Sequence, residues 1–140
     1  MSGTPAALAA AARRVHSGGP WEERFGYCRA VARGPLVAVS GSTATVGGAV
    51  TQVGDAHGQA RTAFGIALAA LAELGLGAEH VLRTRMYLTD IDRDSDAVGR
   101  AHAEFFAANP PAASMVQVAR LIHPDHLVEV ELDAWNPEAP

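Results

Sequence analysis

The sequence contains one cysteine, Cys28, no long apolar run and no excess of positive charge. A single cysteine cannot form an intrachain disulfide, and such scarcity is typical of a reducing compartment, so we expect a cytoplasmic location. No segment approaches the roughly 20 apolar residues that cross a bilayer, and we therefore expect no membrane partner. The formal net charge of -4 leaves no broad basic surface, which argues against a nucleic-acid partner.

What the sequence does contain is the composition of a globular protein, with 49% hydrophobic and 19% charged residues in a chain of 140. That length suits one domain with its own core, which we place at residues 21–137. Residues 1–20 form an alanine-rich extension in which Thr4 and Pro5 predict the start of a short helix. Arg13 and Arg14 follow this stretch, whereas a signal peptide carries its positive charge before the apolar segment.

Hydrophobic periodicity predicts an α+β fold with strand and helix order β-β-α-β-α-β-β. Apolar runs on both sides of Gly34 and Pro35 predict two strands joined by a turn. Apolar residues at three- and four-residue spacing from Ala60 to Leu74 predict one helix, and a second lies around residues 98–105. We expect both helices on one face of a mixed sheet.

Three later segments alternate as strands: residues 80–88, 113–121 and 127–135. In the first of these, alternation places four side chains on one face, namely Leu82, Thr84, Met86 and Leu88. It places the other four on the opposite face, namely Val81, Arg83, Arg85 and Tyr87. The face without helices carries apolar residues among its charges, so we expect it to pack against another copy of the chain.

Charges also segregate by face in the last strand, where Glu129, Glu131 and Asp133 lie on one side. If this strand lies beside the segment with Arg85, the guanidinium could pair with Glu129 or Glu131. One interpretation is a solvated face with weak ion pairs. The other is a cleft between subunits in which Glu129 positions water or moves a proton.

No metal or cofactor site is predicted. His123 and His126 lie close in sequence, but no HxH or HExxH pattern or second cluster accompanies them. His102 is expected to pack on its helix. Cys28 has no histidine or aspartate placed by spacing to activate it, and the glycine-rich segment at residues 47–54 lacks the lysine of a phosphate-binding loop.

Several motifs in order resemble one known family. They are GYCRAV, LVAVSG, QARTAFGIALAALAELG, VLRTRMYLTD, AHAEFF, PPAASMVQVARL and LVEVELDA, and the resemblance covers residues 25–135. Together they are similar to the Rid (reactive intermediate deaminase) family, also called YjgF-like or L-PSP endoribonuclease-like. This resemblance implies a chorismate mutase-like fold and a homotrimer with small-molecule clefts between subunits.

In active relatives the resemblance implies hydrolysis of enamines and imines, such as 2-aminoacrylate, to 2-keto acids and ammonia. Carried over by motif, Tyr27, Ser40 and Gly41 line the substrate pocket and Glu129 positions the hydrolytic water. The arginine that grips the substrate carboxylate in a PARS motif is replaced here by Ala113, and Met115 stands two residues further on.

That replacement leaves two readings of the function open. Arg85 is a candidate substitute anchor, in which case the protein is an enamine or imine hydrolase. Alternatively, the protein is a non-catalytic metabolite-binding or regulatory trimer. Ribonuclease activity, claimed for some relatives, is disfavoured by the acidic charge and the lack of a basic-aromatic stripe.

Overall fold

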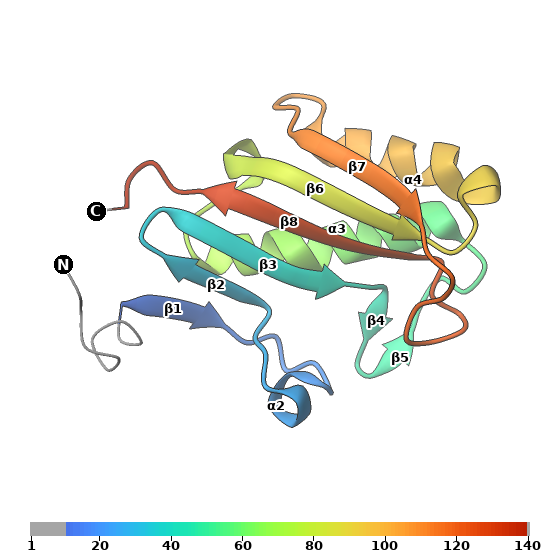
Figure 1. Ribbon diagram of the computed structural model, residues 1–140, viewed down its shortest axis with the longest axis horizontal. Coiled ribbons are helices and arrows are strands. Elements are labelled where there is room, and N and C mark those ends of the chain that lie inside the picture. The colour runs from blue at the N-terminus through green and yellow to red at the C-terminus, as the bar shows by residue number, and fades with distance from the viewer. Residues whose placement is uncertain (1–10, 140) are drawn as a thin grey trace.

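Two long helices pack against one face of a mixed six-stranded sheet in the computed structural model, which describes residues 11–139. Figure 1 shows the sheet in front and both helices behind it. The strands are β1 (Ala12–Val15), β2 (Ala30–Arg33), β3 (Leu36–Ser42), β4 (Thr45–Val46), β5 (Ala49–Val50), β6 (Val81–Leu88), β7 (Ala112–Gln117) and β8 (Val128–Trp135). The helices are α2 (Glu22–Phe25), α3 (Ala56–Glu73) and α4 (Ile91–Phe106), with a 3-10 turn, η1, at Ala78–His80.

The sheet order is β1-β2-β3-β8-β6-β7, and only β6 and β7 run parallel. A parallel pair needs a crossover, which α4 supplies between those two strands. The predicted α+β fold, with two helices on one face of a mixed sheet, is confirmed. Strands β4 and β5 form a separate hairpin beside the end of β3.

Both long helices begin at an aspartate that caps the first turn. Asp55 accepts a hydrogen bond from the Gly58 amide at 3.0 Å, and Asp90 accepts one from the Arg93 amide at 3.0 Å. The faces of α3 and α4 that meet the sheet are apolar, and their aromatic side chains interlock. The Phe64 ring lies 5.4 Å from the Phe106 ring in an edge-on arrangement.

Strand β6 departs from simple alternation at its start. A register shift between Val81 and Arg83 places Val81 in the core, whereas Leu82 is 57% exposed. The predicted faces of these two residues are therefore wrong, because a bulge adds one residue and reverses the side-chain direction before it. From Arg83 to Leu88 the predicted alternation is confirmed: Thr84, Met86 and Leu88 are buried.

The N-terminal prediction also needs correction. Ala12–Val15 is a strand that pairs antiparallel with β2, so the predicted helix is wrong over these residues. The backbone groups of this segment find partners at a sheet edge, which outweighs the helical preference of its alanine and two arginines. The predicted helix start at Thr4 and Pro5 lies outside the described residues.

Strand β7 is shorter than the sequence suggests. It ends at Gln117, although the alternating pattern continues to Leu121. Its neighbour in the sheet, β6, ends at Leu88, which accepts a last hydrogen bond from the Val118 amide at 2.8 Å. Beyond that point no strand among residues 11–139 is available for pairing, so residues 119–121 leave the sheet.

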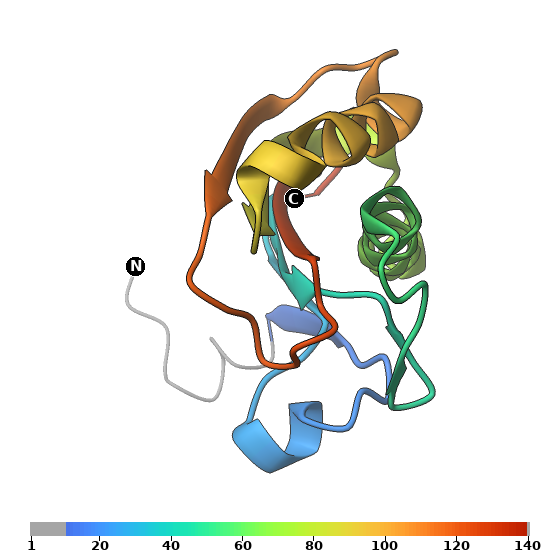
Figure 2. The same cartoon turned by 90° about the vertical axis from the view of Figure 1, so that its right-hand side faces the viewer.

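The sheet face opposite the helices is uncovered by any described element, as Figure 2 shows from the end of the sheet. It carries charged side chains of β6 and β8 together with the exposed apolar side chains of Leu36, Val116 and Trp135. Among the helices of residues 11–139, none is long and apolar enough to cross a membrane.

Candidate functional site

Glu129 lies at the start of β8, where its carboxyl packs directly over Gly41 of β3. A methyl group on Gly41 would approach the Glu129 Cδ to 3.0 Å and its Oε1 to 3.1 Å. The space exists because β3 shifts register between Val39 and Ser42 and carries Gly41 in the irregular segment. A glycine is therefore required here by close approach of a side chain.

The Glu129 carboxyl is half-buried and makes no hydrogen bond to any residue that the structure describes. Burial raises the pKa of Glu129 above its usual value, and the neighbouring Glu131 adds to this rise, while Arg29 opposes it. A carboxyl with unengaged oxygens and a raised pKa can accept a proton from water or from a bound molecule.

Glu129 opens into a cavity of about 210 Å³. Its walls come from the segment before β2, the end of β3, the hairpin strand β4, helix α3 and the loop before β8. The lining residues are Ser17, Gly19, Pro20, Trp21, Phe25, Tyr27, Arg29, Gly41, Ser42, Thr43, Thr45, Ile66, Ile122 and Glu129. A volume below the roughly 300–1,000 Å³ of drug-sized pockets suits a small metabolite.

Arg29 is the one basic residue among the lining residues of this cavity. It is 8% exposed, and its Nη1 donates to the Gly41 carbonyl oxygen at 2.6 Å and to the Ser42 hydroxyl at 3.2 Å. Its Nη2 lies 3.6 Å from a Glu22 carboxylate oxygen and makes no hydrogen bond within residues 11–139. The guanidinium therefore keeps donor capacity for an anionic ligand group.

Glu22 holds the N-terminal segment against this site. Its buried carboxylate accepts hydrogen bonds from the Gly19 amide at 3.0 Å, from the Ser17 amide at 3.1 Å and from the Ser17 hydroxyl. Burial alone would raise the pKa of Glu22, but these hydrogen bonds and Arg29 outweigh it and leave the pKa lowered. These hydrogen bonds, which we call the Glu22 clamp, keep Ser17, Gly19 and α2 at the cavity wall.

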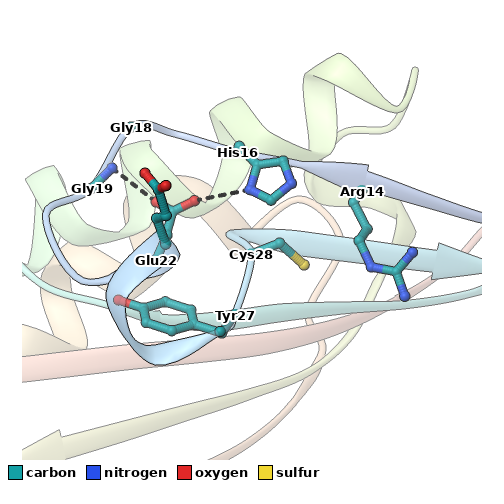
Figure 3. Close-up of a pocket in the computed structure, with 9 residues that line it drawn as sticks. Arg14, His16, Gly18, Gly19, Glu22, Tyr27 and Cys28 are labelled. Atoms are coloured by element: carbon teal, nitrogen blue, oxygen red, sulfur yellow. Dashed lines mark hydrogen bonds and ion pairs between the residues drawn. The ribbon is translucent and has the colours of Figure 1, made fainter.

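A second, larger cavity of about 640 Å³ adjoins the first on the other side of Gly19 and Tyr27. Figure 3 shows Glu22 between His16 and Gly19, with Tyr27 and Cys28 on the segment that connects α2 to β2. The His16 Nδ1 lies 3.7 Å from Glu22. The Glu22 carboxylate is already hydrogen-bonded by Ser17 and Gly19, whereas Glu129 in the smaller cavity is unengaged, so the smaller cavity is the candidate site.

Arg85 lies on the open sheet face, opposite Glu131 in the register. Its Nη1 is 3.0 Å from Asp133 and 3.7 Å from Glu131. The predicted pairing with Glu131 is confirmed, and Glu129 instead stands opposite Tyr87, whose hydroxyl donates to Glu131. Within the described chain, Arg85 does not line the Glu129 cavity.

The remaining predicted site residues lie outside that cavity in the described chain. The Ser40 hydroxyl donates to the Cys28 carbonyl oxygen at 2.6 Å, which ties β3 to the segment before β2. Ala113 is exposed on the edge strand β7, and Met115 packs partly against the core. Tyr27, Gly41 and Glu129 are the predicted residues that come together in one chain.

Histidines do not gather with acidic or sulfur ligands in the described residues: no group of three or more that could hold a metal ion is found there. His102 packs between Phe64 and Phe106, and its Nε2 lies 2.8 Å from the Thr84 hydroxyl. The expected packing role of His102 is confirmed.

Sequence reasoning missed Arg29, Thr43, Thr45 and the cavity role of residues 17–25. Arg29 could have been found from the sequence, since it is a charged residue that interrupts an apolar stretch directly before β2. Thr43 and Thr45 could not have been found from the sequence, because polar residues are common beside a glycine turn. The N-terminal segment could be placed only by its pairing with β2.

Comparison with known proteins identifies the family. The sequence profile described as Endoribonuclease L-PSP matches residues 22–136. A protein of Streptomyces coelicolor, described as uncharacterized, is 49% identical over 126 residues, which are 90% of this chain and 93% of that protein.

Solved structures agree with this assignment. A Mycobacterium tuberculosis member of the YjgF/YER057c/UK114 family is 42% identical with a TM-score of 0.79, covering 89% of this chain and 98% of its own. Escherichia coli TdcF, solved with bound serine, is 26% identical with a TM-score of 0.72, covering 89% and 94%. The chain belongs to the Endoribonuclease L-PSP family, the YjgF-like or Rid group.

Proposed function

We propose that the protein is a small-molecule hydrolase that acts on an enamine, an imine or a related metabolite, with Glu129 positioning the attacking water. The observation that carries this proposal is the Glu129 carboxyl, which stands unengaged at the wall of a cavity of about 210 Å³ and has a raised pKa. Such a carboxyl is suited to proton transfer to and from a bound molecule.

The chemistry needs one acceptor and one donor of protons. Glu129 takes a proton from water while the water oxygen bonds to the imine carbon, and it passes this proton to the imine nitrogen to give a carbinolamine. Glu129 then takes the proton of the carbinolamine hydroxyl and delivers it to the nitrogen, so that the C–N bond breaks and ammonia leaves as the carbonyl forms. An enamine enters this sequence after tautomerising to the imine.

Arg29 is the substrate anchor that the single chain offers. It lies in the same cavity as Glu129 and retains donors on Nη2, which suits a carboxylate. The bound serine of TdcF supports a ligand of this kind, since serine is a small molecule that carries a carboxylate. The earlier candidate, Arg85, is engaged by Asp133 and Glu131 on the open face, and its role as anchor stays a prediction.

A non-catalytic metabolite-binding trimer is the second candidate, favoured by Ala113 at the position where active relatives carry arginine. We also propose that the chain assembles as a homotrimer, as the family resemblance implies. Nuclease activity, which the family description suggests, is disfavoured by the net charge of -4.

Trapping of 2-imino acids with semicarbazide tests the hydrolase proposal. The wild-type protein should divert the imine from the trap, and Glu129→Gln should lower this rate on the order of a hundredfold. Arg29→Lys should raise KM more than it lowers kcat, because it keeps the charge but loses the fork geometry. Wild-type and Glu129→Gln rates both at the uncatalysed level would overturn the hydrolase proposal in favour of the binding protein.

The variant Arg85→Ala, measured in the same assay, distinguishes the two candidate anchors. An unchanged rate in this variant supports Arg29 as the anchor, since Arg85 then serves the open face only. A rise in KM in Arg85→Ala with none in Arg29→Lys would instead assign the anchor to Arg85.

A further inference from the structure

His126 is a buried side chain that packing alone does not explain. It is 1% exposed in the loop before β8, and its Nε2 lies 2.9 Å from the Thr45 hydroxyl. Its Nδ1 is buried and has no hydrogen-bond partner in the described part of the chain. An apolar side chain of similar size would avoid this unpaired atom, so the ring needs a role that an apolar side chain could not fill.

The ring is held in place by a neighbour from α3. Gln59 is fully buried, and its side-chain amide donates to the Asp125 carbonyl oxygen at 2.9 Å and accepts from the Leu127 amide at 2.9 Å. These two hydrogen bonds flank His126 in the sequence. They fix the backbone on both sides of the ring and therefore its position beside Thr45.

A chain of hydroxyl groups connects His126 to the cavity of Glu129. The Thr45 hydroxyl lies 2.8 Å from the Thr43 hydroxyl, and both threonines line that cavity. The direction of donation along this chain depends on which nitrogen of His126 carries the proton.

Physical chemistry decides the tautomer. Burial lowers the pKa of His126, His123 lowers it further and Asp125 opposes this, so the ring is neutral at pH 7. A proton on Nδ1 would be a buried donor without an acceptor, which folded proteins rarely tolerate. A proton on Nε2 is donated to Thr45, and Thr45 in turn donates to Thr43. The hydroxyl hydrogen of Thr43 then remains available for donation to a ligand in the cavity.

We propose that His126 acts through Thr45 to hold the Thr43 hydroxyl as a hydrogen-bond donor to the ligand. The cavity thereby selects molecules that present an acceptor oxygen at this point, either an oxo group or a carboxylate. This proposal rests on the proposed function in taking the same cavity as the ligand site. His126 is a positioning residue, since it reaches the ligand only through the threonines.

The tautomer is tested in the ligand-free protein, without any assay of activity. Long-range ¹H–¹⁵N correlation spectra of ¹⁵N-histidine-labelled protein at pH 7 distinguish a protonated from an unprotonated ring nitrogen. We expect the His126 proton on Nε2, with His123→Gln used to separate the signals of the two neighbouring rings. A proton on Nδ1 would reverse the chain of donors and overturn the proposal.

Ligand discrimination is tested with 2-oxobutanoate and butanoate, which differ only in the oxo group. Thr43→Val should weaken binding by about tenfold for the probe whose oxygen meets Thr43, and Thr43→Ser should restore it. Loss for 2-oxobutanoate alone assigns the oxo group, and equal loss for both probes assigns the carboxylate. Unchanged affinity for both probes in Thr43→Val, with an unchanged Tm, would overturn the proposal.

Thr45→Val tests the link itself, because it keeps Thr43 but separates it from His126. We expect this variant to lose most of the affinity that Thr43 contributes to probe binding. Full retention of that affinity would show that His126 does not act on Thr43. If neither probe binds the wild-type protein, the cavity is not the ligand site and both proposals fail. Normal binding with the proton on Nδ1 would overturn the role of His126 alone.

Discussion

At Gly41 the absence of a side chain decides where the Glu129 carboxyl can lie. Gly41→Ala would place a methyl group 3.0 Å from Glu129 Cδ, and the carboxyl must then move by several tenths of an ångström. A misplacement of about 1 Å can cost on the order of a hundredfold in rate, and a smaller shift costs less. We expect kcat/KM to fall by roughly tenfold while Tm changes little, as measured by imine trapping and thermal denaturation.

Gly99→Ala is the matched control. Gly99 lies in α4, where an added methyl group meets nothing within 4 Å. This variant should gain about 0.5–1 kcal/mol of stability from helix propensity and keep full activity. Equal activity losses in the two glycine variants would show that the Gly41 effect is unrelated to Glu129.

The Glu129 carboxyl should also lower the stability of the folded protein at neutral pH. Its raised folded-state pKa means that the native state holds the proton more tightly than the unfolded chain. Ionisation therefore weakens the native state as the pH rises from about the unfolded value through the folded pKa. Glu129→Gln should be more stable than the wild type at pH 7.5, and this advantage should vanish below the ordinary value of 4.5.

Urea denaturation at several pH values measures this difference. Glu131→Gln provides a contrast, because it replaces the charged acceptor of the Tyr87 hydroxyl and partner of Arg85 with a neutral amide and should not stabilise the protein. A Glu129→Gln variant whose stability tracks the wild type at every pH would contradict the raised pKa.

At the scale of elements, Glu22 fastens the N-terminal segment to the sheet. Glu22→Gln removes the charge that compensates the buried Arg29 and weakens three hydrogen bonds, so we expect a loss of about 2–4 kcal/mol. Because the Glu22 pKa is lowered in the folded state, this contribution is present above pH 4.5 and is lost as the pH falls through the folded value.

The neighbouring carboxyl gives the control for this clamp. Glu23 is exposed in the same short helix, and Glu23→Gln should change stability by less than about 0.5 kcal/mol. Hydrogen exchange should locate the effect, with faster exchange at the Ser17 and Gly19 amides in Glu22→Gln only. Equal protection of these amides in both variants would show that the clamp does not hold the segment.

The elements show which parts of the fold can be predicted from sequence. Helix α3 and strand β8 were predictable, since their periodicity reflects burial of one face and local caps agree with it. The bulge before Arg83 and the strand at Ala12–Val15 were not, because each depends on pairing with a distant segment. The face on which a residue lies within one strand could be predicted from the sequence. A contact between two segments, such as that of Arg29 with Gly41, depends on the pairing of those segments in the folded protein.

The same distinction applies to the candidate site. Tyr27, Gly41 and Glu129 were predicted from motifs of the family, and they meet in one cavity. Thr43, Thr45 and His126 escaped prediction because their link spans 81 residues between Thr45 and His126 and leaves no local pattern. Arg85 was placed on the correct face, and of its two predicted partners Glu131 lies within ion-pair distance, whereas Asp133 was not predicted. Alternation gives the side of a strand and not the neighbour across it.

At the scale of the whole molecule, we expect the open sheet face to pack against another copy of the chain. Leu36, Val116 and Trp135 are 56%, 45% and 47% exposed there, beside half-buried ion pairs. Apolar surface of this kind on an uncovered sheet is typical of subunit interfaces. We expect sedimentation equilibrium of the wild-type protein to give three times the chain mass of 14.5 kDa.

Val116→Asp tests which face forms that trimer. A carboxylate on the open face would be buried without a partner in the assembly, so we expect dissociation into monomers that keep their fold. Val53→Asp is the matched control, since Val53 is 61% exposed outside that face and its variant should remain trimeric. Dissociation in Val53→Asp but not in Val116→Asp would place the interface elsewhere. If the dissociated Val116→Asp protein also loses imine hydrolysis while its Tyr27 and Glu129 signals stay unchanged by NMR, a neighbouring subunit completes the Glu129 cavity.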